Sequence, residues 1–405
     1  MPGRKGNTMP NLHTVRPAAP GPCPLAAKNC GGCPLSGLAY PEQLALKQKN
    51  TEALLAKFGP VAPILGAEQP WGYRNKAVAT FAQGPRGKLV CGTYAAGSHR
   101  VLPAVDCPLL APRLNQTLAA ALAAANACRW PAYDEDTGEG LVRHLVLRYA
   151  RAADAVLVTV VTGQPVLPGS RNFVAALRKS APWVRSVVQN YNPRATSAVL
   201  DAGPRAEKVL FGPGSVTDTL CGRTFTLSSR SFYQVNPAQT ERLYAAALAA
   251  AGLTGAETVL DAYCGIGTIG LCAAGRAKTV VGVERSRDAV ANAVQNARRN
   301  GIANARFFCA DATAWMAGAA AEHFSPDVVF LDPPREGSTP DCIRAVAAMR
   351  PARVVYVSCN PATLARDLVL FAAAGYRAAG FQPVDMFPQT EHVETVVLMS
   401  RVDGK

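Results

Sequence analysis

Residues 261–270 read DAYCGIGTIG, and this stretch decides the fold of the C-terminal half of the chain. It follows a short apolar run and contains Gly265, Gly267 and Gly270 in the spacing G-x-G-x-x-G. Glycine lets the backbone turn tightly between a strand and a helix and approach a bound nucleotide closely. The stretch therefore predicts a nucleotide-binding turn. By itself it suits an NAD site, an S-adenosyl-L-methionine (AdoMet) site, or a turn that serves only packing.

Strand and helix patterns alternate around this turn. A helix is predicted at 237–251, and another at 286–301 with Ser286 as N-cap and Gly301 as its stop. The runs that predict strands are TVLDAYC, TVVGVE, ARFFCAD, DVVFLDPP and RVVYVSC. Such alternation is typical of a parallel sheet with helices on both faces. With a final antiparallel hairpin of strands near 376–387 and 392–401 on its edge, we expect a seven-stranded Rossmann-like sheet.

The preceding residues have a different organisation. In the helix predicted at 41–58, Leu44, Thr51, Leu54, Leu55 and Phe58 share one face and the lysines lie elsewhere. Short strands and a helix at 111–128 indicate an α+β region. The expected segments are a disordered basic tail (1–22), a Cys-rich loop (23–39), a helical segment that packs on the catalytic domain (40–66), a central α+β domain (67–230) and the Rossmann-like domain (231–405).

The composition narrows the class of protein. Lys and Arg number 42 against 28 Asp and Glu, and the resulting charge of +14 favours a polyanionic partner such as nucleic acid, although a solvated basic surface would look the same. We find no signal peptide and no apolar run long enough for a membrane span, so we expect a cytoplasmic protein without a membrane partner. Twelve cysteines in such a chain indicate metal ligands, nucleophiles or small core residues rather than a disulfide framework.

The ends of the other predicted strands carry chemically informative residues. The fourth strand ends in LDPPREG at 331–337 and the fifth in SCNP at 358–361. Ligands of such sheets bind at the carboxyl ends of the strands. Asp332 and Cys359 should therefore border the cofactor crevice, with Glu284 placed to bind ribose hydroxyls. Hydride transfer has no use for this thiol, whereas the Asp-Pro-Pro turn is typical of nucleic-acid methyltransferases.

A thiol at this place suits methylation of a pyrimidine carbon. Attack of a thiolate on C6 of uracil makes C5 nucleophilic, so that C5 can accept a methyl group before a base removes its proton. Asn360-Pro361 predicts the start of a helix, whose N-terminus favours the thiolate of Cys359. Glu394 interrupts an apolar strand and is the candidate base, with His392 on the same face. A buried structural cysteine and an exposed glutamate of an edge strand are the alternatives.

Together these stretches resemble the RNA uracil-5-methyltransferase family. The matching motifs are SFYQVN (231–236), DAYCGIGTIGL (261–271), LDPPREG (331–337), SCNPATLARDL (358–368) and HVETVVLM (392–399), with further echoes in WGYRNKA (71–77) and GLVRHLVLR (140–148). The resemblance implies that Cys359 is the nucleophile and Glu394 the base. It implies AdoMet or uridine contacts for Gln234, Tyr263, Gly265, Gly267, Thr268, Glu284 and Asp332.

The N-terminal cysteines add a second resemblance. Cys23, Cys30 and Cys33 form C-x6-C-x2-C, and Cys107 follows later. Four thiolates without histidine suit zinc or an iron–sulfur cluster. The pattern resembles the family branch that modifies 23S rRNA, which implies a 4Fe–4S cluster. Many relatives have a β-barrel RNA-binding domain before these cysteines, whereas here a basic tail precedes Cys23. We expect a monomer with no obligate protein partner.

Three other functions compete with this one. A cytosine-C5 methyltransferase would also use a cysteine, but often one that follows Pro in the fourth-strand motif. An amino-group methyltransferase would use the Asp-Pro-Pro turn and need no thiol. A non-catalytic iron–sulfur protein that binds RNA would need neither AdoMet nor Glu394.

Overall fold

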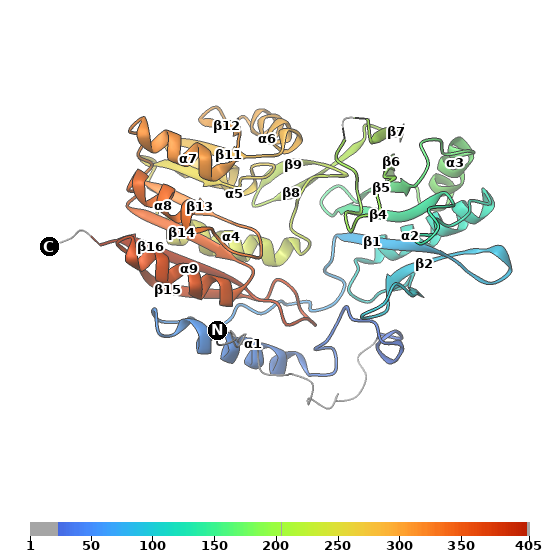
Figure 1. Ribbon diagram of the computed structural model, residues 1–405, viewed down its shortest axis with the longest axis horizontal. Coiled ribbons are helices and arrows are strands. Elements are labelled where there is room, and N and C mark those ends of the chain that lie inside the picture. The colour runs from blue at the N-terminus through green and yellow to red at the C-terminus, as the bar shows by residue number, and fades with distance from the viewer. Residues whose placement is uncertain (1–22, 204, 403–405) are drawn as a thin grey trace, which may run out of the picture.

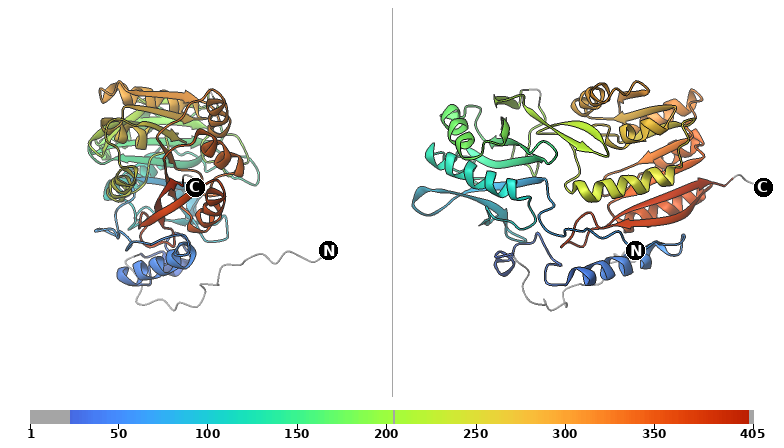
Figure 2. Two further views of the ribbon diagram at one scale, coloured as in Figure 1. Left: turned by 90° about the vertical axis from the view of Figure 1, so that its left-hand side faces the viewer. Right: turned by 180° about the vertical axis from the view of Figure 1, so that it is seen from behind.

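The computed structural model describes residues 23–203 and 205–402, so the tail predicted at 1–22 lies outside the described residues. Two seven-stranded sheets lie side by side (Figure 1), and helix α1 (Tyr40–Leu55) runs below the C-terminal sheet in that view. The two further views agree with this arrangement (Figure 2). In the described part of the chain, no helix combines the length and the apolar character needed to cross a membrane.

The C-terminal sheet has the order β12-β11-β10-β13-β14-β16-β15. Its strands are β10 (Thr258–Ala262), β11 (Thr279–Glu284), β12 (Ala305–Cys309), β13 (Val328–Leu331), β14 (Arg353–Ser358), β15 (Tyr376–Val384) and β16 (Glu394–Arg401). Strands β10 to β14 are mutually parallel and β16 is antiparallel to both of its neighbours. The predicted seven-stranded Rossmann-like sheet is confirmed. The predicted antiparallel hairpin on the edge of the sheet is also confirmed, and its second strand, β16, is the one that pairs with β14.

Helices cover both faces of this sheet. The helices are α4 (Pro237–Ala251), α5 (Thr268–Ala273), α6 (Arg287–Arg299), α7 (Ala312–Ala321), α8 (Pro340–Met349) and α9 (Pro361–Ala373), with the short 3-10 helix η3 (Ala274–Arg276). Successive residues of β14 face opposite ways: Val355 packs in the core that contains α4 and α5, and Tyr356 in the core that contains α7 to α9. A strand buried on both faces is apolar throughout, which is why these runs were recognisable from the sequence.

The central sheet has the order β3-β2-β1-β4-β5-β6-β7. Its strands are β1 (Lys76–Gln83), β2 (Leu89–Tyr94), β3 (Val101–Pro103), β4 (Val142–Ala150), β5 (Ala155–Thr162), β6 (Val184–Tyr191) and β7 (Glu207–Phe211). Its helices are α2 (Pro112–Ala127) and α3 (Ser170–Ser180), and two 3-10 turns, η1 (Ala26–Lys28) and η2 (Pro85–Gly87), precede α2. Leu114 and Phe173 of the two helices share one core with the strands, as expected for an α+β region.

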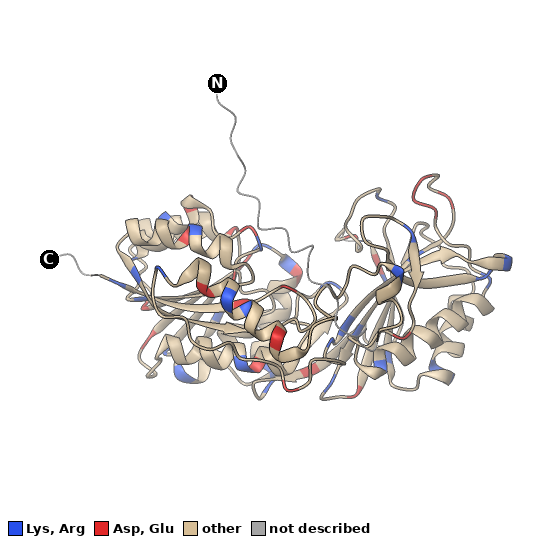
Figure 3. Cartoon of the chain, turned by 90° about the horizontal axis from the view of Figure 1, so that it is seen from below, with Lys and Arg blue, Asp and Glu red and all other residues tan. Residues whose placement is uncertain are grey.

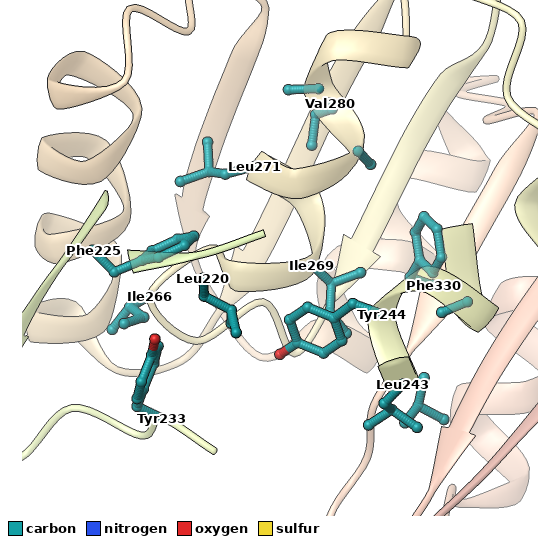
Figure 4. Packing of buried hydrophobic residues seen from close by; sticks show 14 of the residues in the cluster. Leu220, Phe225, Tyr233, Leu243, Tyr244, Ile266, Ile269, Leu271, Val280 and Phe330 are labelled. Atoms are coloured by element: carbon teal, nitrogen blue, oxygen red, sulfur yellow. The ribbon is translucent and has the colours of Figure 1, made fainter. Parts of the chain in front are cut away.

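A hairpin of β8 (Ser215–Leu220) and β9 (Arg223–Ser228) joins the two sheets. Its Phe225 and Leu220 lie in one hydrophobic cluster with Ile266 and Ile269 of the nucleotide-binding turn (Figure 4). The same cluster includes Leu157 of the central sheet. The two sheets therefore share a continuous core, which holds the central region against the catalytic half.

Helix α1 differs from the sequence prediction in its buried face. Gln43, Lys47, Thr51 and Leu55 are buried, so the lysine at 47 does not point away from the packed face. The Lys47 ammonium lies 2.6 Å from a carboxylate oxygen of Asp385, which follows β15. Tyr40 donates a hydrogen bond of 2.8 Å to the other oxygen of Asp385. The helical pattern alone could not reveal this ion pair because its partner lies more than three hundred residues along the chain.

Candidate active site

The junction of β14 and α9 presents the predicted nucleophile. Strand β14 ends at Ser358, and the side chain of Asn360 caps α9 by accepting a hydrogen bond of 3.1 Å from the Ala362 amide. Cys359 lies between them and is partly exposed. Ser358 pairs with Thr395 of β16, so Glu394 stands at the neighbouring position of the adjacent strand. Glu394 is only 4% exposed, which excludes the alternative of an exposed edge-strand glutamate.

Three ionisable groups of this junction influence one another. Burial, then Glu394 and Asp332, raise the pKa of the Cys359 thiol to about 11, while Arg335 acts in the opposite direction. Burial and Asp332 raise the pKa of Glu394 to about 8. Burial raises the pKa of Asp332 to about 7. Desolvation and the two carboxyl groups thus oppose the influence of the helix N-terminus, which favours the thiolate.

Arg335 and His392 form the exposed rim of the junction. The Arg335 guanidinium lies 3.1 Å from Nδ1 of His392. Burial, Arg335 and Lys47 lower the pKa of His392, which favours the neutral ring. The sequence prediction placed His392 beside Glu394 on one strand face, whereas His392 precedes β16 and contacts the Asp-Pro-Pro-Arg loop. Arg335 was part of a quoted motif, but nothing in the sequence distinguished it from a solvated arginine.

The glycine-rich turn lies where the sequence predicted it, between β10 and α5. Tyr263, Gly265 and Gly267 all have positive φ angles, of 69°, 56° and 84°. Glu284, at the end of β11, accepts hydrogen bonds from the amides of Gly265 (3.3 Å) and Ser286 (2.7 Å). This carboxylate therefore lies beside the turn, at the carboxyl edge where the ribose of a nucleotide cofactor binds in such sheets.

The third glycine of the turn has a packing role. A Cβ at Gly270 would lie 2.9 Å from a carboxylate oxygen of Asp261, to which the Gly270 amide donates a hydrogen bond of 2.8 Å. Burial raises the pKa of Asp261 to about 7, opposed by this hydrogen bond. The Thr268 hydroxyl lies 2.9 Å from the hydroxyl of Tyr244 on α4 (Tyr244 in Figure 4). Asp261 and Tyr244 were not predicted, since each was hidden among apolar neighbours.

The loop before α4 is held by the central sheet. Gln234 is buried, and Asn75 makes two hydrogen bonds to the backbone around it. The Asn75 side chain donates to the Gln234 carbonyl (3.1 Å), and the Asn75 backbone amide donates to the Val235 carbonyl (2.9 Å). The guanidinium of Arg148, which is buried, donates to the Ser231 carbonyl. Asn75 and Arg148 lie in the two further stretches that resemble the family, 71–77 and 140–148, for which the sequence predicted no role.

The four predicted metal-ligand cysteines approach one another from two parts of the chain. Burial and the neighbouring Cys107, Cys23 and Cys30 raise the pKa of Cys33 to about 12. All four side chains are partly exposed. Across the described ranges, no group of three or more His, Cys, Asp and Glu side chains stands in an arrangement that could hold a metal ion.

Comparison with known proteins identifies the family. A family model described as tRNA (Uracil-5-)-methyltransferase matches residues 202–402. Uncharacterised RNA methyltransferases of Halalkalibacterium halodurans and Lactiplantibacillus plantarum are each 41% identical to this chain. The alignments cover 93% and 96% of this chain, and 82% and 86% of the relatives. The chain belongs to the RNA uracil-5-methyltransferase family.

This uracil-5-methyltransferase family membership confirms the resemblance drawn from the sequence. The chain is an AdoMet-dependent RNA methyltransferase, so the predicted cofactor AdoMet is confirmed and the alternative of an NAD enzyme is wrong. The crystal structure of Pyrococcus abyssi tRNA (uracil-54, C5)-methyltransferase with S-adenosyl-L-homocysteine matches with a TM-score of 0.75 and 24% identity, over 92% of this chain and 86% of that one. This likeness supports the fold.

Proposed function

We propose that this methyltransferase forms 5-methyluridine in 23S rRNA through a covalent bond between Cys359 and C6 of the target uracil. The observation that supports this best is the meeting of Cys359, Glu394 and Asp332 at the ends of three adjacent strands. A thiol, a buried base and a second carboxyl are the groups that a uracil-C5 reaction needs. An amino-group methyltransferase would not need the thiol.

The proposed sequence of steps conserves electrons and protons. The Cys359 sulfur, once deprotonated, bonds to C6 of uracil, and the C5–C6 electron pair becomes available at C5. AdoMet would supply the methyl group that C5 receives and would leave as S-adenosyl-L-homocysteine, whose sulfur keeps the electron pair of the broken carbon–sulfur bond. Glu394 as carboxylate then removes the C5 proton, the C5–C6 double bond re-forms, and the sulfur leaves with its electron pair. A pKa of about 8 suits Glu394 to both receive and release a proton near neutral pH.

We propose that AdoMet binds along the carboxyl ends of β10, β11 and β13. The Glu284 carboxylate would bind the ribose hydroxyls, and the backbone at Gly265 and Gly267 would approach the cofactor closely. The remaining proposed contacts to AdoMet or uridine are Gln234, Tyr263, Thr268 and Asp332. The hydrogen bond between the Tyr244 and Thr268 hydroxyls would hold the Thr268 hydroxyl in one orientation.

The RNA partner is proposed from charge and resemblance. A net charge of +14 favours a polyanion. In the backbone view of Figure 3, Lys and Arg positions are interspersed with Asp and Glu positions along both halves of the chain, so the support for RNA binding comes from long-range attraction by the net charge. We propose that the protein acts as a cytoplasmic monomer and that Cys23, Cys30, Cys33 and Cys107 hold a 4Fe–4S cluster. The spacing of these cysteines and the resemblance to the 23S rRNA branch support the cluster, although in the described residues their side chains do not stand in an arrangement that could hold a metal ion.

The decisive experiment uses 23S rRNA fragments that contain 5-fluorouridine. Fluorine at C5 cannot be removed as a proton, so the enzyme should remain covalently attached to the RNA and migrate as a denaturation-resistant complex. Cys359→Ser should abolish the complex, and Glu394→Gln should let unmodified RNA be methylated but retain it as an adduct. Cys309→Ser, which changes an exposed cysteine at the end of β12, is the matched control. A fully active Cys359→Ser enzyme would refute the proposal.

A further inference from the structure

Helix α9 carries an ion pair between the half-exposed Arg366 and the buried Asp367, for which the reaction has no direct use. Asp367 is fully buried, and one of its carboxylate oxygens accepts hydrogen bonds from the Ser338 amide and the Tyr356 hydroxyl, both of 2.7 Å. Its other oxygen accepts from two nitrogens of Arg366, at 2.9 and 2.7 Å. Each oxygen thus accepts two hydrogen bonds, so this buried carboxyl group has no unpartnered oxygen.

Arg366 extends this arrangement to the loop that follows β13. Its guanidinium donates to the carbonyls of Glu336 (2.8 Å) and Ser338 (3.2 Å). Nearer the start of α9, the Thr363 hydroxyl donates to the Arg335 carbonyl at 3.3 Å. Side chains from three positions of α9 therefore hold consecutive parts of the loop that carries Asp332.

The glycine within this loop shows how closely it approaches the helix. Gly337 has a φ of 79°, and a Cβ there would lie 2.6 Å from an Asp367 oxygen and 2.7 Å from an Arg366 nitrogen. Glycine is required because the backbone both turns left-handed and presses directly against the charged pair. The loop backbone at Gly337 thus lies directly against the Asp367 and Arg366 side chains of the helix.

This contact joins two groups that the sheet alone does not hold together. Strands β13 and β14 pair as far as Leu331 and Tyr356, and beyond these residues the two strands no longer pair with each other. Asp332 and Cys359 both lie beyond that point. We propose that Arg366 and Asp367 are positioning residues, which clamp the loop of Asp332 and Arg335 against the helix that begins behind Cys359. The inference rests on the proposed covalent mechanism. It gives a role to Arg366 and Asp367, the adjacent Arg and Asp of the motif SCNPATLARDL.

The clamp is tested with Arg366→Met, because this side chain is half-exposed and its aliphatic part is retained, whereas a change at the buried Asp367 could prevent folding. We expect adduct formation on 5-fluorouridine RNA and kcat to fall about tenfold or more, since small misplacements of reacting groups have large effects on rate. AdoMet affinity by calorimetry and KM for RNA should stay near wild type, whereas the melting temperature should fall because the buried Asp367 carboxylate loses its cation, so the rates are compared at a temperature at which the variant is folded. Arg366→Lys should recover part of the loss. Arg344→Met, on an arginine of α8 that pairs with Asp341, is the matched control.

A second readout needs no RNA. Burial is the largest cause of the raised pKa of Cys359, so a loosened loop should admit water and make alkylation of this thiol by iodoacetamide several-fold faster at about pH 8. Slower adduct formation with faster alkylation supports the clamp. Unchanged alkylation, an equal loss in Arg344→Met, or a raised KM with kcat unchanged overturns it. If wild-type enzyme forms no adduct, the proposed function fails, and alkylation alone decides the clamp.

Discussion

Replacing Glu394 with Gln should make Cys359 more reactive, but only at alkaline pH. The pKa of Cys359 is about 11, so about one thiol in a thousand is ionised at pH 8. The pKa of Glu394 is about 8. Below that pH the neutral glutamic acid resembles glutamine, and the substitution should change nothing. Above it, the wild-type carboxylate repels the thiolate, and glutamine does not.

The size of the effect follows from the distance between adjacent strands. A like charge at this range shifts a pKa by about 1 to 3 units, and partial exposure of Cys359 places it at the lower end of that range. A shift of about one unit means roughly tenfold more thiolate at about pH 9.5. Since the thiolate is the species that reacts with iodoacetamide, the alkylation rate should rise by the same factor.

The assay compares two cysteines in the same sample. Wild type and Glu394→Gln are treated with iodoacetamide between about pH 6.5 and 10, a range that spans the Glu394 titration. Modified peptides that contain Cys359 and the exposed Cys309 are quantified by mass spectrometry, so Cys309 corrects for reagent and temperature. If the ratio of Cys359 alkylation to Cys309 alkylation at about pH 9.5 is the same in both proteins, the Glu394 carboxylate does not face the Cys359 thiolate. A tenfold difference already at about pH 6.5 would contradict the raised pKa of Glu394.

Three further predictions concern stability and cofactors. Lys47→Met should lower the free energy of unfolding by about 3–5 kcal/mol, because it leaves the buried Asp385 carboxylate without its cation, and Lys47→Met/Asp385→Leu should recover most of this loss in denaturant titrations. Glu284→Gln should weaken AdoMet binding by about tenfold in calorimetry, whereas the nearby Asp288→Asn, on the exposed side of α6, should not. Cys33→Ser should reduce the iron content of anaerobically purified protein, and Cys128→Ser is the control that should not. Wild-type protein that contains stoichiometric zinc and no iron would reject the 4Fe–4S cluster.

The sequence predicted most of what depends on neighbouring residues. The turn at 261–270, the caps of α6 and the strand ends near Asp332 and Cys359 depend on backbone geometry within a few residues, and glycine, proline and serine indicate that geometry directly. In each case the relevant interaction is local, so the pattern that predicts it is local as well.

The residues that were missed depend on partners far along the chain. Lys47 and Asp385 are 338 positions apart, and Asn75 and Gln234 are 159 apart. No periodicity distinguishes a lysine that enters an ion pair in the core from one on a solvated face. The same holds for Arg366 and Asp367, whose Ser338 partner lies in another loop. Burial of a charge is decided by what packs against it, which a single sequence does not express.

The strand order of the C-terminal sheet also depends on pairing between distant parts of the chain, and it matters for the proposed chemistry. If the final hairpin had joined the sheet in chain order, β15 would neighbour β14, and β16 would lie two strands from Cys359. Adjacent strands are about 4.8 Å apart, so Glu394 would then be about 10 Å from the nucleophile's strand, beyond the reach of one pyrimidine ring. Because β16 instead pairs with β14 through Ser358 and Thr395, the carboxyl and the thiol occupy neighbouring positions. In the proposed mechanism the same proximity would let a uracil bonded at C6 present its C5 proton to Glu394, and it contributes to the raised pKa of Cys359. The antiparallel insertion of β16 is therefore the feature of the fold on which the proposed division between nucleophile and base depends.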